Sequence, residues 1–115
     1  MIQSNKTRIS YVSGSPTFTL VDRLHPYVNI GGNTSLIVSD MLITPHTSFI
    51  FSRNSGNSSN ISLEISAPGK YSAVAKAGNI LFVIYNTDVA DEDVYHCTLD
   101  GKVNATDYTL SVEGR

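Results

Sequence analysis

Apolar and polar residues alternate with a period of two along most of the chain, which is typical of strands with one buried face. The period of 3.6 that marks an amphipathic helix is nearly absent. The alternation predicts nine short strands, at residues 18–21, 27–30, 34–38, 48–52, 61–65, 71–74, 80–85, 94–99 and 108–112. Turn residues separate them, and Asp100-Gly101 is a tight-hairpin signal. The pattern predicts an all-β sandwich or barrel, with one helical turn at residues 87–93.

Length and charge narrow the function classes. The 115 residues predict a single domain spanning 1–115, with its strand pattern at about 16–113. Charged residues make up 16% of the chain and the net charge is −2, without a basic run, which argues against a nucleic-acid-binding surface. The longest apolar stretch, Ile80–Tyr85, is far too short to cross a bilayer, so no membrane insertion by this domain is expected.

A motif near the end of the chain carries a family resemblance. The run Asp91-x-Asp93-x-Tyr95-x-Cys97 resembles the Asp-x-Gly-x-Tyr-x-Cys signature of immunoglobulin domains. In that family the tyrosine hydroxyl binds backbone at a corner between strands. Asp93 replaces the usual Gly, with little consequence expected at an exposed corner. Lys70, twenty-one residues before Asp91, is at the place of a basic residue that pairs with this Asp, so the resemblance implies an ion pair, worth about 0.2–1 kcal/mol if exposed.

The resemblance extends to the core. In Gly32-x-x-x-Leu36-x-Val38, Val38 stands where the family has its first disulfide cysteine, and Phe51 stands where it has a core tryptophan. The implied fold is an immunoglobulin-like β-sandwich, a V-set-like Greek key that lacks the inter-sheet disulfide, with Val38 facing Cys97. A different sandwich with a chance motif is the alternative. One cysteine alone favours a reducing compartment, but under this resemblance Cys97 is a buried remnant.

Sequons for N-linked glycan suggest an extracellular setting. Five occur, where about two are expected by chance in a chain with nine Asn and 25 Ser+Thr. The candidate acceptors are Asn5, Asn33, Asn57, Asn60 and Asn104. The alternative is a Ser/Thr-rich β-protein whose sequons arose by chance.

Residues that would carry catalysis or bind a cofactor are not grouped in the sequence, so neither an enzyme nor a cofactor is expected. His96 and Cys97 are adjacent in a predicted strand and point to opposite faces, so they cannot form a dyad. His25 and His46 lack the spacing of zinc ligands. The acidic residues between Asp88 and Asp93 suit a solvated corner better than a loose Ca²⁺ site.

Recognition is the function that remains. In variable-type members the outer face of the G-F-C-C′ sheet often binds another such face. The residues predicted to form that face are Ile50, His96, Thr98 and Thr109, extended by the predicted strand around Leu63.

Loss of the first cysteine and of the tryptophan, with the later motif kept, resembles the membrane-distal domain of the allorecognition receptors of colonial cnidarians. That resemblance implies the extracellular part of a plasma-membrane glycoprotein whose partner is another copy of itself on an apposed cell. Two alternatives are a structural or heterophilic spacer domain and, with less support because the chain has no Trp, a carbohydrate-binding sandwich.

Overall fold

Two β-sheets form the domain in a computed structural model that describes residues 16–22, 27–55 and 61–113. The strands are β1 (Thr17–Leu20), β2 (Tyr27–Asn29), β3 (Thr34–Ser39), β4 (Phe49–Arg53), β5 (Tyr71–Lys76), β6 (Asn79–Ile84), β7 (Asp93–Leu99), β8 (Val103–Asn104) and β9 (Tyr108–Glu113). A short α-helix, α2 (Leu63–Ser66), precedes β5, and a 3₁₀ helix, η2 (Val89–Asp91), precedes β7.

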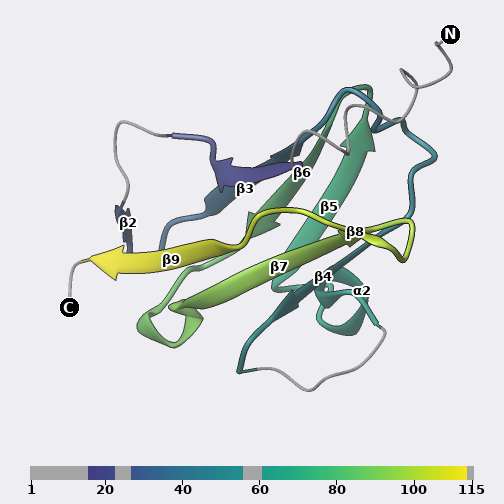
Figure 1. Cartoon of the computed structure of the whole chain (residues 1–115). Helices are drawn as coiled ribbons and strands as arrows, with labels where there is room; N and C mark the ends of the chain where they lie inside the picture. Colours follow the sequence, from purple (N-terminus) through teal and green to yellow (C-terminus); the bar gives the residue numbers. More distant parts are fainter. Residues whose placement is uncertain (1–15, 23–26, 56–60, 114–115) are drawn as a thin grey trace, which may run out of the picture.

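The strand order matches that of an immunoglobulin-like sandwich. One sheet runs β1-β3-β6-β5, and the other runs β2-β9-β7-β4 with β8 beside β7 (Figure 1). All pairs are antiparallel except β2 with β9, which is parallel. The two sheets correspond to the ABED and CFG sheets of immunoglobulin domains, so the predicted immunoglobulin-like β-sandwich is confirmed.

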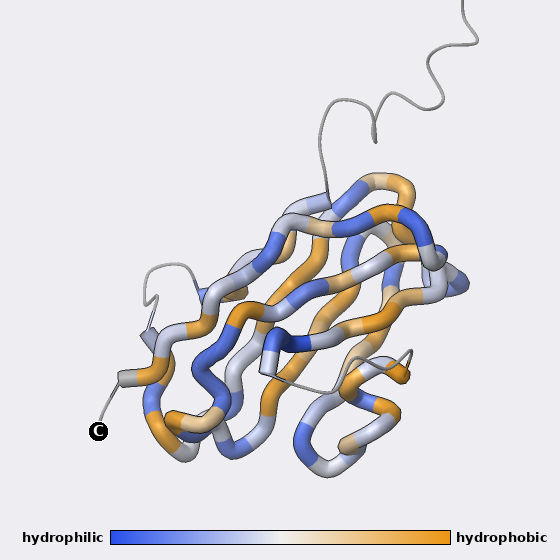
Figure 2. Tube along the Cα trace, turned by 60° about the horizontal axis from the view of Figure 1, so that its bottom comes forward, coloured by the Kyte–Doolittle hydropathy of each residue, from blue (hydrophilic) through white to orange (hydrophobic). Residues whose placement is uncertain are grey.

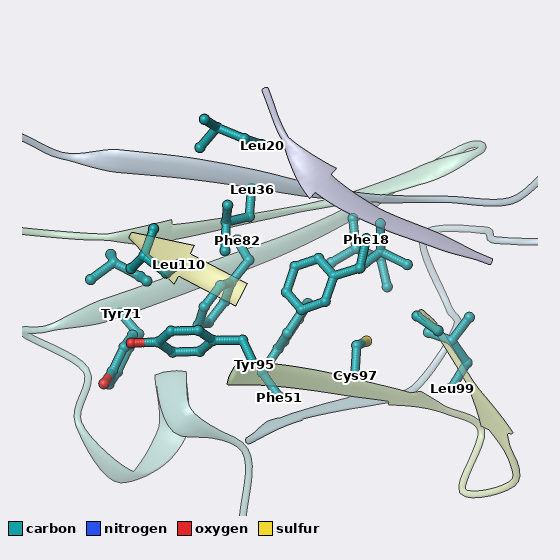
Figure 3. Close-up of a cluster of buried hydrophobic side chains, with 14 of the residues drawn as sticks. Phe18, Leu20, Leu36, Phe51, Tyr71, Phe82, Tyr95, Cys97, Leu99 and Leu110 are labelled. Atoms are coloured by element: carbon teal, nitrogen blue, oxygen red, sulfur yellow. The ribbon is translucent and has the colours of Figure 1, made fainter. Parts of the chain in front are cut away.

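Alternation along the strands builds the core between the sheets. Apolar and polar residues take turns along the strands in Figure 2, and in β3 the side chains of Leu36 and Val38 are fully buried. Phe51, at the tryptophan position, is fully buried and stacks on Phe82 with 4.2 Å between ring centroids. Figure 3 shows these rings and Phe18 gathered between the sheets. The aromatic cluster therefore fills the space that the family's tryptophan would fill.

Val38 and Cys97 lie in the same core on opposite sheets. Val38 on β3 is 0% exposed and Cys97 on β7 is 1% exposed, as expected for residues between the sheets. The Cys97 side chain points from β7 toward the other sheet (Figure 3). Burial raises the pKa of the Cys97 thiol to about 12. The thiol is thus a core group that stays protonated at neutral pH.

The strand predicted at residues 61–65 is wrong. Leu63–Ser66 form the helix α2, closed by a hydrogen bond from Ala67 N–H to Leu63 O of 2.9 Å. The alternating Ile61 and Ile65 are exposed, whereas Leu63 packs against the core. The reason lies at Ser62, which is buried and whose Oγ accepts a 2.8 Å hydrogen bond from Phe51 N–H at the edge of β4, where a strand would have paired.

Two turns differ in detail from the expectations. The Asp100-Gly101 hairpin is present, with positive φ at both residues and a Lys102 N–H to Leu99 O bond of 3.0 Å. It joins β7 to the short β8, and the chain continues in the same direction through residues 105–107 into β9, which also pairs antiparallel with β7. Between β4 and β5, residues 54–55 and 61–70 contain no strand, so the described part of this connection has neither of the extra strands of variable-type domains.

Candidate functional site

The outer face of the five-stranded sheet is the candidate site. Ile50 on β4 pairs directly with Thr98 on β7, and Thr109 on β9 pairs with Val94. Ile50, Thr98 and His96 are partly buried by their neighbours, and Thr109 is exposed. Four of the five residues predicted for a binding face therefore share one face. Leu63 does not belong to it, because it lies on α2 and packs against the core.

His96 is held in place by hydrogen bonds on both ring nitrogens. Its Nδ1 lies 2.8 Å from Asp107 Oδ1, and its Nε2 lies 2.5 Å from Asn54 Oδ1. The imidazole thus bridges the end of β4 and the start of β9. Asn54 and Asp107 were not predicted as part of the face, since only the fold brings them beside His96. A side chain fixed on two sides loses little entropy when a partner covers it.

A sequon asparagine borders the same face. Asn104 on β8 pairs with Thr98, and its Oδ1 accepts a hydrogen bond of 3.1 Å from Thr98 Oγ1. Its side chain is exposed. A glycan at Asn104 would therefore stand beside the predicted face. The sequence did not reveal this neighbourhood, because the β7–β8 pairing that creates it depends on the hairpin geometry.

The other described sequon does not share the position of Asn104 beside the candidate face. Asn33 is exposed just before β3, and its Oδ1 accepts a 3.2 Å hydrogen bond from Asn86 N–H. It lies at one end of the four-stranded sheet, away from the candidate face. Asn5, Asn57 and Asn60 lie outside the described residues.

The corner motif has the geometry that the family resemblance implied. Lys70 Nζ lies 2.8 Å from Asp91 Oδ2, so the expected ion pair is confirmed. The Tyr95 hydroxyl donates to Asp91 O at 2.7 Å, which fixes the turn that leads into β7. Asp91 is only 3% exposed and also accepts from Asp88 N–H, in a capping box at η2. The expectation of an exposed, solvated corner is therefore wrong at Asp91.

Asp93 has a role that the sequence analysis missed. Its Oδ2 lies 2.9 Å from Arg53 Nε, and Ser55 N–H donates to the same oxygen at 3.0 Å. Arg53 also donates from Nη2 to Ala90 O at 2.6 Å and lies 3.6 Å from Asp91. The signal was present as an Asp at the family's Gly position and a basic residue two places after Phe51.

These contacts shift the ionisation of the corner. Burial alone would raise the pKa of the Asp93 carboxyl, but hydrogen bonds from Ser55 and Arg53 hold that pKa well below its ordinary value. Burial would likewise lower the pKa of Arg53, yet the bond to Asp93 keeps it above the usual range. Burial raises the pKa of Tyr95. The corner is thus a fixed array of charges that stabilises the base of the sandwich.

The described residues bring together few side chains of the kinds that carry catalysis or bind a metal ion. His96 points outward and Cys97 inward from β7, as their alternation predicts, so they do not form a dyad. Residues 16–22, 27–55 and 61–113 include no group of three or more His, Cys, Asp or Glu side chains that could hold a metal ion. In the same ranges, no helix has the length and apolar character needed to span a membrane.

Comparisons with known proteins support the fold alone. No protein-family model matches the sequence, and no curated protein matches it. Among solved structures, titin domain M4 in its trigonal form is similar, with a TM-score of 0.55 and 20% identity over 76% of this chain and 84% of that chain. At this identity the likeness shows a shared immunoglobulin-like architecture and carries no function across.

Proposed function

We propose that this domain is an extracellular recognition module of a cell-surface receptor, and that it binds another copy of itself on an apposed cell. The observation that carries the proposal is the pairing of Ile50, on the edge strand β4, with Thr98 on β7 in the outer face. An apolar side chain with polar neighbours on the same face has the arrangement of a small interface with a polar rim. The resemblance to allorecognition receptors supports self/non-self recognition as the role of this contact.

Pre-organisation supports the same face. His96 is fixed between Asp107 and Asn54, and Thr98 is fixed by Asn104. A two-fold contact would place each of these groups against its own copy or its symmetry neighbour, without a long flexible side chain to order. Asn104 is the one described sequon beside this face, so a glycan there would weaken binding.

The test is aggregation of beads coated with the chain. Ile50→Asp places a charge opposite its own copy, and we expect it to abolish aggregation because both charges would have to be desolvated. Met41→Asp is the matched control, since Met41 is 80% exposed in a loop away from the face. Aggregation unchanged by Ile50→Asp, with thermal melting intact in both variants, would refute this face. Wild-type beads that never aggregate would favour a structural or heterophilic spacer.

A further inference from the structure

Four strands end the two sheets, β1, β5, β2 and β4, beside the two-residue β8, and three of these four edges are blunted. At β1, Phe18 N–H donates to Thr106 Oγ1 at 3.1 Å, and at β4, Phe51 N–H donates to Ser62 Oγ at 2.8 Å. The third edge strand, β2, has only three residues. Short edge strands and side-chain caps are the devices by which proteins prevent edge-to-edge pairing. The fourth edge, β5, has six residues and is the longest.

The free backbone groups of β5 can be identified from its pairing with β6. Tyr85 N–H donates to Lys70 O at 2.8 Å, so the even-numbered residues from Lys70 onward face β6. The odd-numbered residues therefore direct their N–H and C=O groups to the edge. Tyr71 N–H already donates to Ala67 O at 3.1 Å, which leaves the groups of Ala73 and Ala75. Within the described part of the chain no cap from another segment covers these groups.

The side chains beside this edge are neutral and partly apolar. Val74 is 51% exposed and Leu81 is 38% exposed, and they lie side by side with Ile37 across the outer face of the four-stranded sheet. Lys76 is the single charged residue in the four strands of this sheet. An edge of this kind accepts another neutral, antiparallel strand.

We propose that two copies of this chain pair side by side through β5, antiparallel about a two-fold axis at Val74. The two four-stranded sheets then form one continuous eight-stranded sheet. This pairing does not depend on the proposed function, because it uses the other sheet.

Hydrogen bonding and charge favour a second copy as the occupant, and charge disfavours one of the neighbouring registers. With Val74 opposite itself, Ala73 of each copy exchanges both backbone hydrogen bonds with Ala75 of the other, so all the free edge groups of these residues are satisfied. Lys76 then lies opposite Ser72. A shift that places Ala73 opposite itself would put Lys70 opposite Lys76, and like charges directly opposite destabilise a strand pair. The contact is smaller than the roughly 800 Å² per partner of a standard interface, so the dimer is expected to be weak in solution.

The register is tested by disulfide trapping on the 115-residue chain. Val74→Cys would place two cysteines in a non-hydrogen-bonded pair, with Cα atoms about 4.5 Å apart, which is within disulfide range. The native Cys97 does not interfere, since it is 1% exposed. In a glutathione buffer we expect a covalent dimer to form about ten-fold faster than with Leu81→Cys, a control on the same face whose copies would lie roughly 14 Å apart.

A second pair of variants makes the test specific. A mixture of Ser72→Cys with Lys76→Cys should give a covalent heterodimer, whereas Ser72→Cys alone should not, because its two copies would be offset by four residues, or roughly 13 Å. Val74→Cys that cross-links no faster than Leu81→Cys would overturn the proposal, provided that both variants melt like the wild type. Efficient cross-linking of Ser72→Cys to itself would overturn the register. Neither result bears on Ile50, so this proposal and the proposed function can fail separately.

Discussion

Arg53 Nε and Asp93 Oδ2 lie 2.9 Å apart at the base of the sandwich, where they join β4 to the first residue of β7. Their side chains are 15% and 9% exposed. Asp93 stands where immunoglobulin domains usually have Gly, so this chain carries an additional charged contact at its corner, next to the Lys70–Asp91 pair.

Replacing Asp93 by Asn should destabilise the fold. The change leaves the Arg53 guanidinium with a neutral partner in a mostly buried place, and we expect a loss of about 1–3 kcal/mol in the free energy of unfolding. Urea denaturation measures it. Asp107→Asn is the control, because Asp107 is 60% exposed and its pair with His96 should contribute less than about 1 kcal/mol. Equal losses in both variants would contradict the assigned role of Asp93.

The same carboxylate should make stability depend on pH in acid. The pKa of Asp93 is lower in the folded chain than its ordinary value of 3.8, so between these two values the unfolded state binds the proton more readily. Its contribution is therefore fully present above about pH 5 and is lost as the pH falls below about 4 toward the folded pKa. Unfolding curves from roughly pH 2 to 6 should show a shallower acid decline for Asp93→Asn than for the wild type. Parallel curves would show that Asp93 is not linked to folding.

Tyr95→Phe should cost more than an equivalent change at the surface. It removes the 2.7 Å hydrogen bond to Asp91 O and leaves that carbonyl unsatisfied in the interior, for an expected loss of about 1–3 kcal/mol. Tyr85→Phe removes a hydroxyl contact to Ser72 at a side chain that is 36% exposed, and should be nearly neutral. Thermal melting compares the two, and similar shifts would count against the corner assignment.

Lys70→Ala tests the buried end of the corner. Asp91 is nearly inaccessible and, among the residues that the structure describes, would keep Arg53, 3.6 Å away, as its cationic neighbour. We therefore expect a loss of about 1–2 kcal/mol, above the range of exposed pairs. A change below about 0.5 kcal/mol in denaturant unfolding would place this pair with exposed ones after all.

Val38→Cys should restore the family's bridge to Cys97. Both positions are buried on opposite sheets, and a disulfide needs Cα atoms roughly 4.4–6.8 Å apart. Under oxidising conditions we expect loss of free thiol and a gain of about 2–4 kcal/mol in stability, reversed by reductant. Thiol titration and melting with and without reductant measure both. Two free thiols after oxidation would show that the two positions do not face each other.

The sequence predicts most of the strands because burial on one face leaves an alternating pattern, as at Leu36 and Val38. The strand prediction fails at residues 61–65, where Ile61 and Ile65 alternate with Leu63 but are exposed, Ile61 before the helix α2 and Ile65 within it. The same limit hides the Arg53–Asp93 pair, whose members are forty residues apart and meet only through the β4–β7 pairing. It also hides the proximity of Asn104 to Thr98, which a two-residue strand creates.

The unbridged core has a mechanical consequence. In a domain with a disulfide between its sheets, a force on the two ends cannot extend the segment between the two cysteines, because the covalent bridge carries the load. Here Val38 and Cys97 share no covalent bond, so a pulling force that breaks the sheets can draw out the whole chain, including the half that lies between these residues. A force on its two ends can therefore extend this domain further, and dissipate more work, than a domain of the same length that has the bridge.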